Sequence, residues 1–344
     1  MSNYIFDRNI FSANVSVDKL RIGDILSHDV YLRNGTLLIN AGTKLSDKKV
    51  QKLKKLKNKI VTLDLNKIYY RGVQASKNLF KDVIEGQVLE KKTVEKILDP
   101  FIDEIKREKD IVKLLGRLQS KDDYTFQHTV KIGMLVMVLG GWLGLSETDL
   151  HRLILAGTLH DIGKSQIPLS ILNKPGLLTA EEFETMKLHT IYGYELLDRS
   201  DEYDEEIKKG ILQHHERLDG SGYPYHLKNK DIQYFARIIA VVDIYHAMTT
   251  TRIYREKKDP FNILNHLRQN ISGLDASIVF VFINNMVSML QECQVVLNNG
   301  MIGDVIYVDK EFINAPLIKI VDSTEVFDLR VRDDIEIVDV IYDE

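Results

Sequence analysis

The chain of 344 residues contains a single cysteine, Cys293. One cysteine excludes an intramolecular disulfide and a cysteine-rich zinc site, and it fits a reducing compartment. Residues 1–8 also lack the basic start and the apolar core of a secretion signal. The sequence therefore predicts a cytoplasmic protein.

Long hydrophobic runs and an excess of one charge are lacking as well. A long stretch without a charged residue, residues 132–145, is too short to span a bilayer and contains four glycines, so it predicts a buried helix. A net charge of −4 gives no general attraction to nucleic acid or to an anionic membrane surface. We therefore expect no DNA, RNA or membrane partner. A bound nucleotide must then be held locally, by metals and a few cationic side chains.

Hydrophobic residues make up 44% and charged residues 28% of the chain, which is typical of a globular protein with a full core. The length suits two or three domains. Residues 1–71 predict a small α+β module without catalytic groups. Asn34-Gly35 marks a hairpin, Ser46 caps a basic helix, and residues 60–65 read as a strand. The lysines of this helix favour a solvated face over a nucleic-acid patch because no aromatic residues interleave with them.

Residues 72–292 predict a helical domain. Apolar residues recur at three-and-four spacing through the lead-in segment 72–119, which forms either the first layer of this domain or a homodimer contact. Residues 293–344 predict a small β-rich module, because Asn299-Gly300 signals a second hairpin and four short apolar runs follow it. The fold class is mainly α, and the terminal modules are expected to pack, to sense or to bind unknown protein partners.

The chemistry of the chain begins at His160 and Asp161, which directly follow the apolar run 153–159. Asp243 interrupts another apolar run, 238–244. A buried imidazole or carboxylate is costly to desolvate, and a metal ion compensates both. A single histidine on an apolar helix is more often a hydrogen-bonded core residue than a ligand. Five histidines and two aspartates at the edges of apolar helices favour a metal centre instead; they are His128, His160, Asp161, His189, His214, His215 and Asp243.

The motifs resemble those of the HD-GYP family, a branch of the HD hydrolase superfamily. The matching blocks are His-Asp-Ile-Gly-Lys at 160–164, His-His-Glu at 214–216, Asp-Gly-Ser-Gly-Tyr-Pro at 219–224 and Arg-Ile-Tyr-Arg at 252–255. The resemblance implies an all-helical HD-type bundle. It also implies a bacterial second-messenger enzyme, a metal-dependent phosphodiesterase that linearises cyclic di-GMP to pGpG, and possibly on to GMP, through a metal-bridging hydroxide.

The same resemblance implies two divalent metal ions per chain. His128, His160, Asp161 and Asp243 would hold one ion, and Asp161, His189, His214 and His215 the other, with Asp161 as the bridge. Nitrogen and oxygen ligands without sulfur suit iron or manganese and do not exclude zinc.

The substrate-binding groups come from the same motifs. Lys164 lies one helical turn beyond His160 and is expected to neutralise a phosphate oxygen or to protonate the leaving oxygen. Arg252 and Arg255 would grip phosphates, or else form a surface salt bridge. Tyr223 would stack on a guanine base, or else pack in its turn. We give His246, one turn after Asp243, a smaller weight as a partner of a metal ligand.

The chain departs from the family pattern at two positions. Tyr124 stands where some members carry a glutamate associated with a third metal, and His226 stands where the family usually has glycine. Two alternatives stay open: a phosphodiesterase for another cyclic dinucleotide, and a receptor that binds cyclic di-GMP with little turnover. A complete ligand set weighs against the receptor.

Overall fold

The structure is a computed structural model of the chain. It describes residues 12–16, 20–27, 30–31, 37–54, 60–96, 124–249, 259–269, 271–291 and 293–341. The chain divides into two compact units, Met1–Ser76 with Lys96–Lys109, and Lys77–Glu95 with Asp110–Glu344. Each unit is described by itself.

The smaller unit is a mixed module. Strand β1 (Ser12–Ser16) pairs antiparallel with β4 (Ile60–Asp64), and β2 (Val30–Tyr31) pairs antiparallel with β3 (Leu37–Ile39). Helix α1 (Asp47–Lys54) buries Val50 and Leu53. Its lysines at 48, 49, 52 and 54 are exposed, which agrees with the solvated face expected from the sequence. Helix α2 (Leu65–Ile84) follows β4, and the predicted domain boundary at residues 71 and 72 lies inside it.

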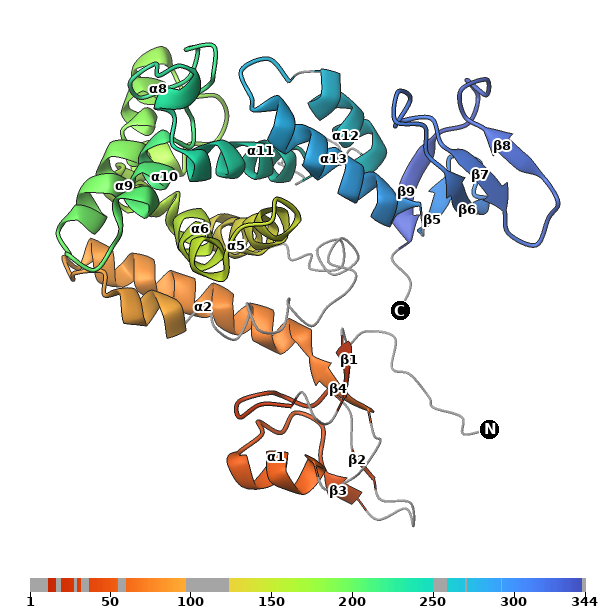
Figure 1. The fold of residues 1–344 in the computed structure, drawn as a ribbon, viewed down its shortest axis with the longest axis horizontal. Coiled ribbons are helices and arrows are strands. Elements are labelled where there is room, and N and C mark those ends of the chain that lie inside the picture. The colour runs from red at the N-terminus through yellow and green to blue at the C-terminus, as the bar shows by residue number, and fades with distance from the viewer. Residues whose placement is uncertain are drawn as a thin grey trace. The chain divides into compact units, whose positions relative to one another are not determined.

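The larger unit consists mainly of helices, drawn from orange through green to blue in Figure 1. After the end of α2, residues 91–96 are also helical. The remaining helices are α5 (Tyr124–Trp142), α6 (Glu147–Leu159), η2 (Ile162–Gln166), α7 (Leu169–Leu172), α8 (Ala180–Lys187), α9 (His189–Asp198), α10 (Glu205–Gln213), η3 (Asn229–Asp231), α11 (Tyr234–Thr249), α12 (Pro260–Gln269) and α13 (Ala276–Leu290).

Helix α5 is the buried helix that the long uncharged run predicts. All of residues 127–140 except Lys131 are buried. It lies beside α6 (Figure 1), and glycines permit this close approach, because a Cβ on Gly157 would come within 2.6 Å of a Val136 methyl carbon. The lead-in segment packs on the same helix, since the rings of Phe80 and Phe126 meet edge to face at 5.2 Å. These contacts hold the helix that carries His128 against the helix that ends at His160.

The C-terminal module is an antiparallel sheet in the order β8-β7-β6-β5-β9. Its strands are β5 (Gln294–Leu297), β6 (Ile302–Tyr307), β7 (Leu317–Ile320), β8 (Val326–Asp328) and β9 (Ile337–Ile341). The hairpin predicted at Asn299-Gly300 joins β5 to β6, and Gly300 has a φ of 82°, which glycine adopts without strain. The mainly α fold with a β-rich tail is thus confirmed.

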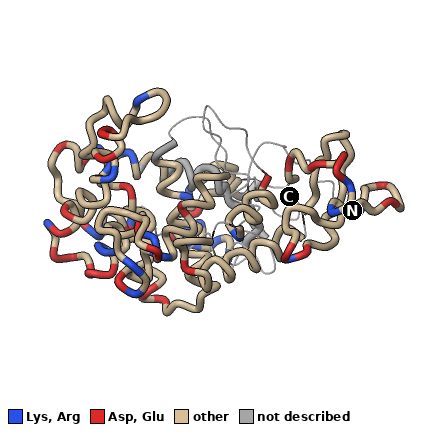
Figure 2. Tube along the Cα trace, turned by 90° about the horizontal axis from the view of Figure 1, so that it is seen from above, with Lys and Arg blue, Asp and Glu red and all other residues tan. Residues whose placement is uncertain are grey.

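The distribution of charged residues and the apolar character of the helices bear on possible partners. Lys and Arg are interspersed with Asp and Glu along the helices of the larger unit (Figure 2). Within the described residues, no helix combines the length and the apolar character needed to cross a membrane.

Candidate metal centre

The seven predicted ligands come together from five segments of the larger unit. His128 lies on α5, His160 directly after α6, Asp161 before η2, His189 at the start of α9, and Asp243 on α11. His214 and His215 directly follow α10. Their side chains form three overlapping groups in which one ligand atom per residue lies within 4.8 Å of the others; the groups are His189, His214 and His215; His128, His160 and Asp243; and His160, Asp161 and His214.

Three of these histidines share one orientation, which a backbone carbonyl three residues earlier in the chain imposes. The Nδ1 atom of His160 lies 2.8 Å from the carbonyl oxygen of Gly157. In the same way, Nδ1 of His189 lies 2.7 Å from Met186 O, and Nδ1 of His214 lies 2.6 Å from Ile211 O. A carbonyl only accepts, so in each ring Nδ1–H donates and Nε2 is left with its lone pair. That tautomer is the one that binds a metal through Nε2.

Asp161 lies between two of these groups and turns one oxygen toward each. Its Oδ2 lies 3.3 Å from His160 Nε2 and 3.5 Å from His128 Nε2, whereas its Oδ1 lies 3.4 Å from His189 Nε2. Lys164 Nζ donates to Oδ2 at 2.6 Å. Among the described residues, Oδ1 receives no hydrogen bond although it is buried. A buried carboxylate oxygen without a donor is costly unless a cation is bound there.

The imidazole nitrogens pose the same problem. His128 Nε2 lies 3.1 Å from His160 Nε2 and 3.3 Å from Asp243 Oδ1, and the Nε2 atoms of His189 and His214 are 3.5 Å apart. These are mostly lone pairs directed at lone pairs, an arrangement that a divalent cation would stabilise. The residues therefore fit a metal, and their nitrogen and oxygen atoms suit iron, manganese or zinc.

The electrostatics keep most of the ligands in their metal-binding form. Burial lowers the pKa of His189 to about 4 and lowers the pKa values of His214 and His215 well below the usual value, so these imidazoles are neutral near pH 7. Burial opposes ionisation of Asp161, but His160 and Lys164 beside it hold the pKa of this carboxyl well below its usual range. Burial would also lower the pKa of His160, and the charge of Asp161 outweighs it and raises that pKa.

These shifts predict how the metal-free protein responds to acid. His189, His214 and His215, together with His246, have lowered pKa values and take up protons mainly on unfolding. The free energy of unfolding should therefore decrease as the pH falls from about 6.5 to about 4. Each such proton contributes about 1.4 kcal/mol per pH unit. His160, whose folded pKa is raised, acts in the opposite sense, and its contribution is lost only as the pH rises.

Urea unfolding of chelator-treated protein at several pH values tests this expectation. The triple variant in which His189, His214 and His215 are replaced by glutamine should show a much shallower slope between pH 6 and pH 4. A wild-type free energy that stays constant over this range would contradict the neutral, buried state of the three rings.

His246 is the ligand partner that the sequence underrated. Its Nδ1 lies 2.9 Å from Nδ1 of His128, and both rings are buried. Burial, followed by the neighbouring His128, holds the pKa of His246 well below its usual value. A neutral His246 can accept through Nδ1, so that His128 donates its Nδ1–H and keeps Nε2 for a metal. His246 thus does for His128 what backbone carbonyls do for the other three rings.

The segment after α10 supports one side of the centre. Tyr223 stacks on His215, with ring centres 4.6 Å apart at 30°. The buried carboxylate of Glu216 accepts the backbone N–H groups of Tyr225 at 2.6 Å and Leu227 at 3.0 Å. Between them His226 adopts a φ of 56°, a conformation that glycine adopts more readily. Glu216 therefore explains how histidine is tolerated where the family usually has glycine.

Two of the predicted cationic side chains cannot be placed, but the structure shows another cationic side chain near the candidate ligands. Arg252 and Arg255 lie outside the described residues. Arg217 is half-buried, and its Nη1 donates to the carbonyl oxygens of Glu216 at 2.8 Å and His214 at 3.3 Å. Burial lowers the pKa of Arg217, while Asp243 and Tyr223 are close enough to oppose that shift. Its position in a glycine-rich loop gave no sequence signal of this contact.

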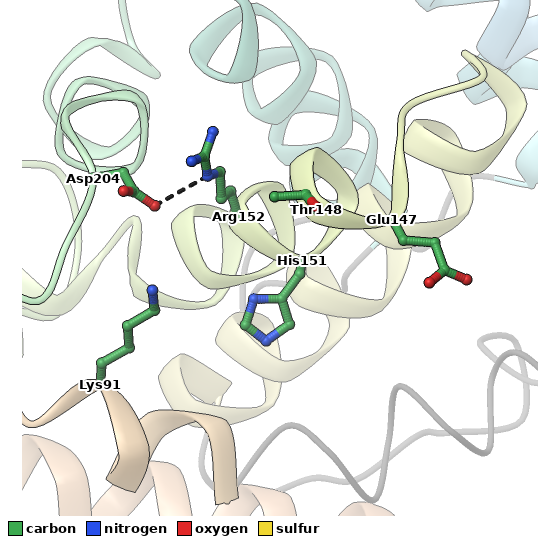
Figure 3. Close-up of a pocket in the computed structure, with 6 residues that line it drawn as sticks. All are labelled: Lys91, Glu147, Thr148, His151, Arg152 and Asp204. Carbon is green, nitrogen blue, oxygen red and sulfur yellow. Dashed lines mark ion pairs between the residues drawn. The ribbon is translucent and has the colours of Figure 1, made fainter.

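A separate polar hollow lies away from these ligands. It is lined by Lys91, Glu147, Thr148, His151, Arg152 and Asp204 (Figure 3). Arg152 Nε pairs with Asp204 Oδ2 at 3.0 Å within it. Because its acidic and basic groups balance, the hollow shows no selectivity for an ion of either sign.

The chain is similar to known proteins in the region that contains these motifs. Residues 115–278 match the model of the HD domain. The chain thus contains an HD domain over just under half of its length. The seven ligands all lie within the matched HD domain, and the expected resemblance to HD-GYP proteins is confirmed. An HD domain implies binding of divalent metal, in agreement with the three clusters.

Two curated relatives and one solved structure are similar to this chain. A cyclic di-GMP phosphodiesterase of Pseudomonas aeruginosa is 30% identical over 250 residues, which are 73% of this chain and 60% of that protein. The 3'3'-cGAMP-specific phosphodiesterase 2 of Vibrio cholerae is 37% identical over 152 residues, 44% of this chain and 28% of that protein. The chain thus spans three fifths of the first relative and less of the second.

The solved structure concerns the fold alone. It is an HDG"Y"P protein from Bdellovibrio bacteriovorus, with a TM-score of 0.52 and 16% identity. The likeness covers 81% of this chain and all of that one. The helical HD-type fold expected from the sequence is confirmed by it.

Proposed function

We propose that this chain is a metal-dependent phosphodiesterase that hydrolyses cyclic di-GMP to linear pGpG. The observation that carries the proposal is Asp161, whose two oxygens face two different groups of histidines at 3.3–3.5 Å. A carboxylate in this position suits a pair of divalent ions, proposed to be iron or manganese. The two relatives are named as phosphodiesterases, which supports the same class of reaction for this chain.

The proposed division of the ligands follows the two sides of Asp161. His128, His160, Asp161 and Asp243 would hold one ion, and Asp161, His189, His214 and His215 would hold the other. A bound metal pair supplies Lewis acidity toward the phosphate oxygens and an activated water near neutral pH. Everything else must come from the side chains that surround it.

Lys164 is one of these side chains, and it contacts Asp161 directly. Its side chain is 25% exposed while its Nζ donates to Asp161 at 2.6 Å, so the ammonium lies at the boundary between the buried ligands and solvent. An ammonium has two further hydrogens, which can be donated to a phosphate oxygen or to the leaving oxygen. Arg252 and Arg255 are proposed to bind the second phosphate, and Tyr223 to flank the substrate.

A panel of cyclic dinucleotides tests the proposal. Purified protein loaded with iron or manganese is assayed against cyclic di-GMP, 3'3'-cGAMP and cyclic di-AMP, with product analysis by chromatography. We expect hydrolysis of cyclic di-GMP to be fastest. Preference for 3'3'-cGAMP would favour the activity named for the Vibrio relative, and tight binding without turnover would identify a receptor.

The number of metals gives a further prediction, which rests on Tyr124. A phenol has a reference pKa near 10 and is a poor ligand at neutral pH, so a third cation would lack the carboxylate found in some HD-GYP proteins. We expect two metals per chain by elemental analysis. We also expect the product to remain mainly pGpG, because its terminal phosphate carries extra negative charge that one fewer cation must accommodate.

Replacing Tyr124 with glutamate supplies the matched variant. It should raise the metal content toward three per chain and increase the yield of GMP. Three metals in the wild-type protein, or rapid accumulation of GMP, would contradict the prediction.

A further inference from the structure

One exposed aromatic ring lies beside the metal centre and has no role in the chemistry described so far. Phe183, on α8, is 46% exposed. Its ring centre lies 6.3 Å from that of Tyr223, at an angle of 79°. Because Tyr223 stacks on His215, Phe183 is the next ring outward from a candidate metal ligand.

A cation completes this arrangement. Lys187 follows Phe183 by one helical turn, and its Nζ lies 5.0 Å from the ring centre of Phe183 and 5.7 Å from that of Tyr223. The ammonium donates to Glu184 Oε1 at 2.7 Å, and two of its three hydrogens are not used in that bond. We call Phe183, Lys187 and Tyr223 the aromatic corner.

Core packing does not account for the aromatic corner. None of the residues of α8 is buried, so Phe183 contributes little to the hydrophobic core. The helix is already fixed at its start by a capping box between Thr179 and Glu182. A large ring left half in water, next to a buried polar site, is better suited to contact a ligand.

We propose that the aromatic corner binds a guanine base. The base stacks on Phe183, and the flexible Lys187 side chain moves its ammonium from over that ring to the O6 and N7 edge of the base. Stacking on an aromatic ring is available to every base. Lys187 adds the selectivity, because guanine presents two adjacent acceptors on this edge whereas adenine presents one acceptor and one donor. The inference rests on the proposed function, since it takes the phosphate of the same nucleotide to lie at the metal centre.

The test compares three ligands that differ only in the base. Isothermal titration calorimetry on metal-loaded full-length protein measures the binding of GMP, AMP and ribose 5-phosphate. GMP should bind about tenfold more tightly than ribose 5-phosphate, which corresponds to about 1.4 kcal/mol. Phe183→Ala should reduce this ratio to below about twofold, whereas Phe183→Tyr should retain it.

The second variant tests selectivity. Lys187→Met keeps the length of the side chain and removes its charge, so it should abolish the preference for GMP over AMP while binding of ribose 5-phosphate changes little. Leu177→Ala is the matched control, because Leu177 is 93% exposed in the loop before α8 and carries no ring. It should leave all three affinities unchanged.

The outcomes separate this inference from the proposed function. A GMP-to-ribose 5-phosphate ratio that survives Phe183→Ala, or that is already near one in the wild type, overturns the aromatic corner as a base site. If the wild-type ratio is lost in Phe183→Ala but no cyclic dinucleotide is hydrolysed, the base site stands and the phosphodiesterase proposal fails. If cyclic di-GMP is hydrolysed with an unchanged Michaelis constant in Phe183→Ala, the base site fails and the phosphodiesterase proposal stands.

Discussion

Replacing Asp161 with asparagine is expected to lower turnover of cyclic di-GMP by at least about a thousandfold and to leave the purified protein short of metal. The substitution changes the size of the side chain very little. It removes the negative charge that faces both groups of histidines, and it places an amide N–H₂ where a lone pair is needed. Lys164, whose Nζ lies 2.6 Å from Asp161 Oδ2, loses its charged partner at the same time.

Metal content by elemental analysis and the initial rate with excess metal give the two readouts. Asp198→Asn is a matched control, because that carboxylate is 53% exposed and pairs with Lys208 at the surface. It should keep full metal content and activity, since exposed ion pairs contribute little to stability. An Asp161→Asn protein with full metal content and wild-type turnover would rule out the bridging role.

Replacing His246 with leucine is expected to weaken the affinity for metal by about 10- to 100-fold, although His246 is not itself in a candidate ligand group. Leucine has a similar volume but cannot accept the hydrogen bond that fixes the tautomer of His128, which lies 2.9 Å away. The freed ring can then rotate or hold its proton on the wrong nitrogen. Competition with a chelator of known affinity measures the effect without any assay of activity.

An asparagine at position 246 provides the internal check, because its side-chain oxygen can accept in place of Nδ1. We expect His246→Asn to recover most of the affinity that His246→Leu loses. His151→Leu serves as a control, since His151 lies on the outer side of α6 with its side chain 38% exposed. Equal losses in the leucine and asparagine variants would mean that His246 acts through packing alone.

The candidate ligands could be proposed from the sequence because the cost of burying them is visible there. Asp161 and Asp243 interrupt apolar segments, and a charge in such a segment requires compensation wherever the helices are placed. The capping of α6 depends on a local pattern of the same kind, because Ser146 accepts from Asp149 N, three residues later, at 3.1 Å. The family resemblance then assigned each of these residues to one of the two expected metal ions.

The contacts between distant segments could not be predicted in this way. His246 and His128 are 118 positions apart, and no local pattern tells which face of α11 meets α5. The two bonds from Glu216 to the segment around His226 span 9 and 11 positions and depend on the path of a loop. Strand ends were approximate for a similar reason: residues 335–338 were expected as the last strand, whereas pairing with β5 begins β9 at Ile337.

The orientation of two helices has a consequence for the charge of the centre. Helices α6 and α10 both end at ligands, His160 and His214, so both direct their carbonyl ends toward the same small volume. Each helix end carries roughly half a negative elementary charge. Together they add roughly one unit of negative charge, of which the N-terminus of α9 at His189 cancels roughly half. The two proposed divalent ions would bring four positive charges, and Asp161 and Asp243 would offset only half of them. The helix backbones would thus supply part of the remaining attraction for the ions. The buried site then needs no additional carboxylate, which would be costly to ionise.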